Sequence, residues 1–312
     1  MALTNKKLAY IFPGQGSQYQ GMGLDFEEKS KKGKELFEQA SNIMGQDMKS
    51  LLRDSTNDEL KKTNISQPAI TLVNLVSASY LEEKGIKPSG CAGFSLGEYS
   101  ALAIAGVISI EDCFKLVKIR GEIMQEETNN ITPSGMAAVL GLDPSKVETL
   151  ISEWQIPDLY PANINSHKQI VISGTDSALS TAENNFKIAG VKRFIRLAVA
   201  GPFHSPLMHK ASEKFAPVLE NIVFHNPIIP LYSNVTGSII KSGDEAKKLA
   251  LLHIVKAVRW VEEEKAILEN NFETLLEVGP GKVLQGLWKE TGSNIPCLSA
   301  GTVSDIDMLL AI

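Results

Sequence analysis

The sequence has few cysteines, no long apolar run and only a small excess of charge. Its three cysteines are widely spaced and match no metal-ligand spacing, which argues against a disulfide framework and favours a reducing compartment. The longest apolar stretches, such as residues 101–110, fall short of the roughly 20 residues that a membrane-spanning helix needs. The net charge of −5 argues against binding nucleic acid through bulk charge. We therefore expect neither a membrane anchor nor a nucleic-acid partner.

The N-terminal residues also lack the features of a secretory signal. The segment MALTNKKLAYIF has a basic pair but no separate apolar core and no small-residue cleavage site. Hydrophobic residues make up 43% of the chain and charged residues 21%, which is typical of a globular protein. We expect a cytoplasmic location.

The sequence does contain an alternation of strand-like and helix-like segments, which predicts α/β layering. Residues 8–12 predict a buried strand, and residues 66–85 predict a helix with its apolar positions on one face. A further helix should open after Ser109, because Ser109 and Asp112 form a capping pattern ahead of an apolar run.

Residues 135–199 differ from the segments on either side. They are expected to form strands and helices in the order β-α-β-β-α-β, which is the ferredoxin-like arrangement. We therefore predict a main domain of residues 1–130 and 200–312, with a ferredoxin-like subdomain of residues 131–199 inserted into it.

Residues 93–97, Gly-Phe-Ser-Leu-Gly, match the G-x-S-x-G pattern of a nucleophile elbow. A strand-like segment precedes the pattern and a helix-like segment follows it. In this context the side chain of Ser95 would project alone, and the amide of Leu96 would be the first donor to an oxyanion. The alternative is that Ser95 merely caps a helix beside a packing glycine.

A serine hydroxyl needs a base, and the chain has only five histidines. His204 lies in an irregular loop after the last strand of the subdomain, where catalytic residues concentrate. By position alone, His204 fits a structural role as well as that of a base. Solvated or structural roles suit the other four, namely His167, His209, His225 and His253. Since no aspartate has a recognisable orienting position, we expect a backbone carbonyl to orient the imidazole.

Arg120 falls on the apolar face of the helix that opens after Ser109. That face is formed by Cys113, Leu116, Val117, Arg120 and Met124. An unpaired buried guanidinium is strongly destabilising. Arg120 therefore either reaches solvent or a partner such as Glu98, or it faces a cavity and holds a ligand carboxylate bidentately. The helical pattern leaves both possibilities open.

Six segments, in order and spacing, resemble the malonyl-CoA:acyl carrier protein transacylases of fatty acid and polyketide synthesis. They are residues 12–23, 93–109, 118–125, 201–208, 258–260 and 277–287, so the resemblance covers nearly the whole chain. It implies an α/β-hydrolase-like core with a parallel sheet that carries the ferredoxin-like subdomain. It also implies ping-pong transfer of a malonyl group from malonyl-CoA, through a malonyl-serine, to the phosphopantetheine thiol of acyl carrier protein. No metal or redox cofactor is implied.

By this resemblance, Ser95 is the nucleophile and His204 the base. Gln15 and Leu96 contribute to the oxyanion hole, and Arg120 pairs with the malonyl carboxylate. The resemblance thus selects the cavity-facing possibility for Arg120.

The resemblance also assigns residues around the substrate. Phe203 matches a bulky residue that accompanies unbranched malonyl substrates, and Asn165 lies in a motif that often lines the site. The segment around Val258 and Arg259 matches the region where a backbone carbonyl orients the base.

Phe94 departs from the family pattern, because most members have histidine before the serine. Since the family's base lies on the later loop, we expect catalysis to survive and Phe94 to pack under the elbow or on the pocket wall. Two other functions are an acyl hydrolase of the same fold and a non-catalytic module that binds carrier protein. Arg120 argues against the hydrolase, and the joint presence of Ser95, His204 and Gln15 argues against the inactive module.

Overall fold

The computed structural model describes residues 3–311, and its main sheet is parallel. The strand order is β10-β9-β1-β2, with β1 at Leu8–Phe12, β2 at Gly90–Gly93, β9 at Thr274–Glu277 and β10 at Cys297–Ser299. In the register, Ala9 lies opposite Gly90 on one side and Leu275 on the other. Every residue of β1 is buried, because helices cover both faces of the sheet.

The two faces of β1 meet different helices. Leu8, Tyr10 and Phe12 belong to an apolar cluster with α5 (Thr63–Glu83) and α6 (Gly97–Ile104). Ala9 and Ile11, which point the other way, pack with α12 (Trp260–Leu268) and α13 (Val283–Glu290). This layering leaves the carboxyl ends of the strands along one edge, which is where α/β proteins commonly place their sites.

The second sheet is antiparallel, with strand order β4-β5-β3-β6. Its strands are β3 (Ser134–Leu140), β4 (Leu159–Ser166), β5 (Gln169–Thr175) and β6 (Arg193–Arg196), and its helices are α8 (Pro144–Trp154) and α9 (Asp176–Ile188). Element order and pairing confirm the ferredoxin-like arrangement. The last strand of the subdomain, β6, is short, since only its four residues pair with β3.

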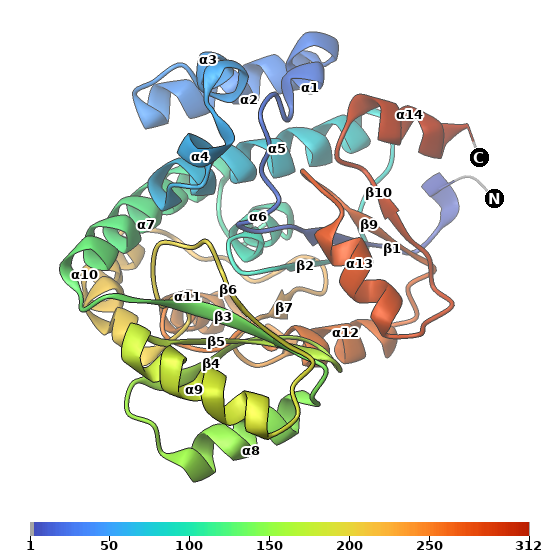
Figure 1. The fold of residues 1–312 in the computed structure, drawn as a ribbon. Coiled ribbons are helices and arrows are strands. Elements are labelled where there is room, and N and C mark those ends of the chain that lie inside the picture. Colours follow the sequence, from blue (N-terminus) through green and yellow to red (C-terminus); the bar gives the residue numbers. More distant parts are fainter. Residues whose placement is uncertain (1–2, 312) are drawn as a thin grey trace.

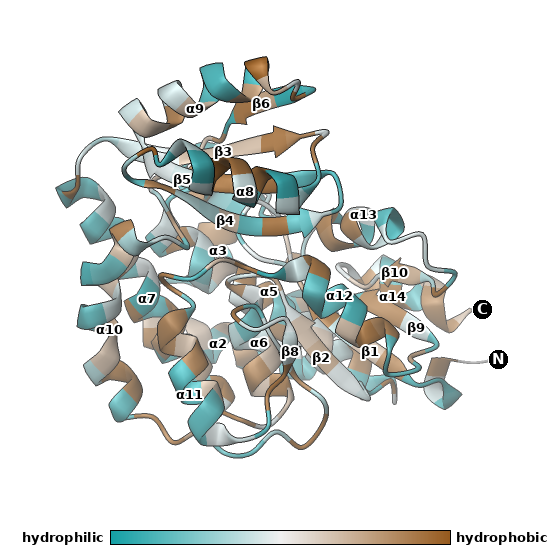
Figure 2. Cartoon of the chain, turned by 90° about the horizontal axis from the view of Figure 1, so that it is seen from below, coloured by the Kyte–Doolittle hydropathy of each residue, from teal (hydrophilic) through white to brown (hydrophobic). Residues whose placement is uncertain are grey.

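The antiparallel sheet has two different faces. Helices α8 and α9 cover the outer face of this sheet (Figures 1 and 2). Ala137 and Val139 pack with these helices, whereas the neighbouring Met136 and Ala138 pack with the main domain. The boundaries of the two domains, placed at residues 131 and 199 from the sequence, stay a prediction.

The other helices surround the parallel sheet, and a two-stranded ribbon completes the fold. The ribbon pairs β7 (Tyr232–Ser233) with β8 (Ser238–Ile239). The remaining α-helices are α1 (Leu24–Lys29), α2 (Lys31–Met44), α3 (Met48–Asp54), α4 (Asn57–Leu60), α7 (Ile110–Asn130), α10 (His209–Glu220), α11 (Gly243–Leu252) and α14 (Val303–Leu310). Short 3-10 turns occupy Leu3–Asn5 and Pro206–Met208. Within residues 3–311, no helix has the length and apolar character required to cross a membrane.

Helices α5 and α7 pack side by side and carry buried polar groups toward the site (Figure 1). Ser109 caps α7 as predicted, because its hydroxyl accepts the amide of Asp112 at 3.0 Å. The prediction of a single apolar face for the helix at 66–85 underestimated how much of this helix is buried, since Gln67, Asn74 and Ser77 are buried as well. Neighbouring elements cover α5 on both sides, so its polar residues bond inside the protein.

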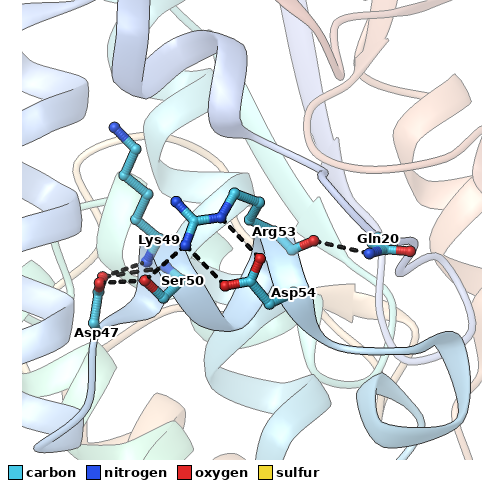
Figure 3. Close-up of polar contacts among 6 residues, drawn as sticks. All are labelled: Gln20, Asp47, Lys49, Ser50, Arg53 and Asp54. Atoms are coloured by element: carbon cyan, nitrogen blue, oxygen red, sulfur yellow. Dashed lines mark hydrogen bonds and ion pairs between the residues drawn. The ribbon is translucent and has the colours of Figure 1, made fainter.

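Side-chain and backbone bonds attach the loop after β1 to helix α3. Gln20 donates through Nε2 to the carbonyl of Arg53 at 2.8 Å (Figure 3). The amide of Gly21 donates to the carbonyl of Leu52. Asp47 caps α3 by accepting the amides of Lys49 and Ser50. These bonds hold the loop that carries Gln15.

Candidate active site

Ser95 occupies a sharp turn between β2 and α6. Its φ of 51° lies in the left-handed region, which is unfavourable for a non-glycine residue. A Cβ at Gly93 would overlap the backbone of Gly97, and one at Gly97 would overlap the carbonyl of Phe12. The two glycines of the pattern are therefore needed for the backbone to pass, and the turn presents the serine hydroxyl at the edge of the parallel sheet.

His204 meets Ser95 across the pocket. Its Nε2 lies 2.7 Å from Oγ of Ser95, and its Nδ1 lies 2.9 Å from the carbonyl oxygen of His253. A carbonyl only accepts, so Nδ1 carries the proton and Nε2 is free to accept the proton of the serine hydroxyl. Burial lowers the pKa of His204 to about 4, and the charge of Arg120 acts in the same direction. The imidazole is thus neutral near pH 7, as a general base must be.

The carbonyl that orients His204 is not the one expected from the sequence. His253, at the C-cap of α11, provides it, whereas the segment around Val258 and Arg259 has another task. The backbone of Val258 bonds Ala162 and Ile164 on either side of a bridge to β4. That prediction was wrong because the carbonyl of Val258 already accepts a hydrogen bond from the amide of Ile164 in the bridge to β4.

The backbone amides of two residues that line the pocket with Ser95 are candidates for an oxyanion hole. Within residues 3–311, neither the N–H of Leu96 nor that of Gln15 bonds a protein acceptor. The turn that carries Gln15 closes on the elbow, since a Cβ at Gly14 would overlap the carbonyl of Phe94. Both amides are thus available to an oxygen bound beside the serine.

Arg120 is buried in the same pocket and only partly paired. Its Nη1 donates to Oε1 of Gln67 at 2.8 Å, and its guanidinium lies 5.3 Å from the ring centre of Tyr99. Within the described part of the chain, its Nε and Nη2 have no hydrogen-bond partner. Pairing with Glu98, one alternative from the sequence, does not occur, because Glu98 accepts the backbone N–H of Asn234 instead. The buried Nε and Nη2 of Arg120 are therefore available to donate to a ligand.

The pocket between the two sheets has a volume of about 220 Å³. Phe203 and Asn165 both line it, and Oδ1 of Asn165 is buried with no partner among residues 3–311. The main domain contributes Gln15, Gln67, Phe94, Ser95, Leu96, Arg120, Met124, Val283 and Leu287. The subdomain and the loop after it contribute Met136, Ala138, Asn163, Asn165, Gln169, Val171, Leu197, Val199, Phe203 and His204.

Phe94 was expected either to pack under the elbow or to lie on the pocket wall, and it does both. Its ring meets that of Trp260 edge to face, with ring centres 5.5 Å apart. No polar group is needed at this position for Ser95 and His204 to meet.

Sequence reasoning missed a buried polar cluster under the elbow, formed by Glu98, Asn234, His253 and Glu263. Burial raises the pKa of Glu98 to about 8, and it raises that of Glu263 well above its usual value. Burial also lowers the pKa of His253 well below its usual value. Gln67, which holds Arg120, was missed as well. Each of these residues is a single polar residue outside any recognisable motif, and only the fold brings them together.

The chain matches the acyl transferase domain family over residues 9–307. It is 35% identical to a malonyl CoA-acyl carrier protein transacylase of Bacillus subtilis (strain 168), and the alignment covers 97% of this chain and 96% of the relative. The corresponding protein of Escherichia coli (strain K12) is 37% identical, with 91% of this chain and 92% of the relative covered.

Solved structures agree with the sequence comparison. The crystal structure of MCAT from Streptococcus pneumoniae superposes with a TM-score of 0.93 at 34% identity, covering 98% of this chain and 99% of that one. A malonyl-transacylase solved in complex with a type II PKS acyl-carrier protein gives a TM-score of 0.91 at 36% identity, with 98% and 99% covered. This chain belongs to the acyl transferase domain family and, within it, to the malonyl CoA-acyl carrier protein transacylases.

Proposed function

We propose that this protein is an acyltransferase that moves the malonyl group of malonyl-CoA to the phosphopantetheine thiol of an acyl carrier protein, through a malonyl ester of Ser95. The observation that carries the proposal is the convergence in one small pocket of a hydroxyl, a neutral imidazole 2.7 Å from it and a half-paired guanidinium. The first two groups suit acyl transfer, and the third suits an acyl group that ends in a carboxylate.

In the first half-reaction, Oγ of Ser95 attacks the thioester carbonyl of malonyl-CoA. Nε2 of His204 takes the hydroxyl proton, since Nδ1 already donates to His253. The negative oxygen of the tetrahedral intermediate accepts the amides of Leu96 and Gln15. The carbon–sulfur bond then breaks, the CoA sulfur receives the proton from His204, and the malonyl ester of Ser95 remains.

The second half-reaction runs the same steps in reverse with a different thiol. The phosphopantetheine thiol of the carrier protein gives its proton to Nε2 of His204, and its sulfur attacks the ester carbonyl. The ester carbon–oxygen bond breaks and Oγ of Ser95 recovers the proton. Every proton and leaving group is thus provided by Ser95, His204 and the two thioester substrates, so the proposed steps require no metal or redox cofactor.

Arg120 would select the acyl group. Its free Nε and Nη2 present two N–H donors, which match the two oxygens of the malonyl carboxylate. Gln67 holds the remaining side of the guanidinium, so little side-chain freedom is lost when the carboxylate binds. Phe203 and Asn165 line the same pocket, where the bulk of Phe203 would disfavour a branched acyl group. We also infer a cytoplasmic location, supported by three buried cysteines that form no disulfide.

The test is transfer to a purified carrier protein from malonyl-, methylmalonyl- and acetyl-CoA, with release of free acid measured in parallel. We expect malonyl transfer to exceed the other two and to exceed hydrolysis, and we expect Ser95→Ala to abolish it. Free malonate as the main product would indicate an acyl hydrolase. Absence of any turnover in the intact protein would indicate a binding module.

A further inference from the structure

Asn234 lies directly behind the nucleophile, at the carboxyl end of β7. The chain just before β7 runs parallel to β2, with Leu231 bridged to Cys91. Residues that follow two neighbouring parallel strands lie at the same edge of the sheet. Asn234 and Ser95 are therefore brought together although 139 positions separate them. Asn234 is completely buried.

The side-chain oxygen of Asn234 accepts two hydrogen bonds that lead to the two reacting groups. One comes from the backbone N–H of Ser95 at 2.6 Å, and the other from Nε2 of His253 at 3.1 Å. The first fixes the strained backbone at Ser95. The second holds the residue whose carbonyl orients His204. We propose that Asn234 is a positioning residue that sets the distance between Ser95 and His204 by tying both of their supports to one oxygen atom.

The remaining groups of Asn234 fix the orientation of this oxygen. Nδ2 donates to the carbonyl of Gly93 at 2.6 Å and to Oε1 of Glu263 at 2.8 Å. The backbone N–H donates to Glu98 at 2.7 Å, and the backbone carbonyl accepts the amide of Arg259 at 2.8 Å. Since a backbone N–H can only donate, the atom facing Ser95 must be the oxygen, so the amide cannot be flipped.

The same argument fixes the protonation of His253. Its Nε2 faces an oxygen and therefore carries the proton, and its Nδ1 has no partner within residues 3–311. A neutral His253 in this tautomer is consistent with its burial. The pair of Asn234 and His253 thus forms one bonded path from the backbone of the nucleophile to the carbonyl behind the base.

The inference rests on the proposed roles of Ser95 and His204, so its test uses a probe that reacts with an activated serine without any acyl transfer. Phenylmethanesulfonyl fluoride forms a bond between sulfur and the serine oxygen and releases fluoride, while the hydroxyl proton goes to the base. Its inactivation rate constant reports the alignment of Ser95 and His204 directly.

Asn234→Ala should lower both kcat and the inactivation rate by about 100-fold with KM little changed, which is the loss expected when reacting groups move by about 1 Å. Asn234→Asp keeps an oxygen at the Oδ1 position, so it should recover at least about tenfold over the alanine variant. His253→Gln keeps a donor at similar reach and should stay within about threefold of the unchanged protein, whereas His253→Leu should lose about tenfold.

Tyr10→Phe is the matched control, because it removes one buried hydrogen bond, 2.9 Å long, to the carbonyl of Ile86, and neither residue is part of the pocket lining. It should lower the unfolding temperature without changing either rate. If Asn234→Ala keeps the inactivation rate of the unchanged protein, or if aspartate gives no recovery over alanine, Asn234 is only structural and the proposal fails. The two histidine variants decide the matter if the alanine variant does not fold, since equal rates for glutamine and leucine would overturn it. An unchanged protein that reacts with the sulfonyl fluoride but transfers no malonyl group would contradict the proposed function instead.

Discussion

The two sheets bury very different interiors. The apolar cluster between the antiparallel sheet and helices α8 and α9 includes Ala137, Val139 and Phe186, and within residues 3–311 every buried glutamate, arginine and histidine lies outside the subdomain. The main domain buries Glu98, Asn234, His253 and Glu263 under the nucleophile, with each polar group close to another. An apolar core stabilises without direction, whereas buried polar groups fix angles and distances. The main domain therefore buries polar groups at a cost in desolvation free energy where they fix the geometry of the site. The core of the subdomain has no such polar cluster.

The subdomain contributes to the site through its other face. Met136, Ala138 and Val171 point from the sheet into the pocket, while Asn163 and Asn165 lie where β4 bridges to residue 258. The subdomain thus forms one wall of the pocket, whereas Ser95 and His204 lie outside the subdomain. The comparison predicts that substitutions in the polar cluster change rates, and that substitutions in the apolar core change stability.

The largest effect should come from removing the base. His204→Ala should lower kcat by about 10⁶-fold, which is the loss caused by removing the base of a serine–histidine pair in a serine protease. His209→Ala is the control, because His209 is exposed and its Nε2 lies 3.3 Å from Glu213 on the surface of α10. Steady-state transfer assays check both variants, and a loss below about tenfold for His204→Ala would assign the proton transfer to another group.

Removing Arg120 should have a smaller but selective effect. Arg120→Ala should lower malonyl transfer by about 100-fold or more, since a buried carboxylate then has no cation, and should leave acetyl transfer nearly unchanged. Arg120→Lys keeps the charge but not the planar fork, so its rate of malonyl transfer should fall between those of the unchanged protein and Arg120→Ala. Equal losses for malonyl-CoA and acetyl-CoA would show that the guanidinium supports the fold rather than the substrate.

A substitution in the subdomain core should give the opposite result. Phe186 is fully buried and its ring centre lies 4.7 Å from that of Trp154. Phe186→Ala should lower the free energy of unfolding by about 3–5 kcal/mol through cavity formation. Urea unfolding measures this loss, and the kcat of the folded variant at low temperature should stay close to that of the unchanged protein. A large drop in kcat without a loss of stability would contradict the prediction that the subdomain core affects stability rather than rate.

The smallest effect concerns pH. Burial raises the pKa of Glu98 to about 8, so the folded protein holds a proton that the unfolded chain loses above its ordinary value of 4.5. Stability should therefore decline as pH rises from about 4.5 through about 8. Glu98→Gln keeps an oxygen for the amide of Asn234 but cannot ionise, so its unfolding free energy should decline less between pH 6 and 9. Identical pH slopes for the two proteins would mean that Glu98 is already ionised when folded.

Sequence reasoning identified the local features of the site better than its long-range ones. The glycine pattern around Ser95, the cap at Ser109 and the order of strands and helices along the subdomain follow from neighbouring residues, so they could be predicted. The carbonyl behind His204 could not be located, because it depends on how α11 ends and on how residue 258 bridges to β4. Gln67 and Asn234 gave no signal, because a single amide acquires its role only from partners 53 and 139 positions away.

The most direct test of the account is the mass of the protein after brief mixing with malonyl-CoA, followed by peptide mapping. We predict the addition of one malonyl group, located on Ser95, that forms in the Phe186→Ala variant but not in Ser95→Ala. It should disappear when carrier protein bearing a free phosphopantetheine thiol is added. A malonyl group on any other residue, or one that persists in the presence of carrier protein, would contradict the account.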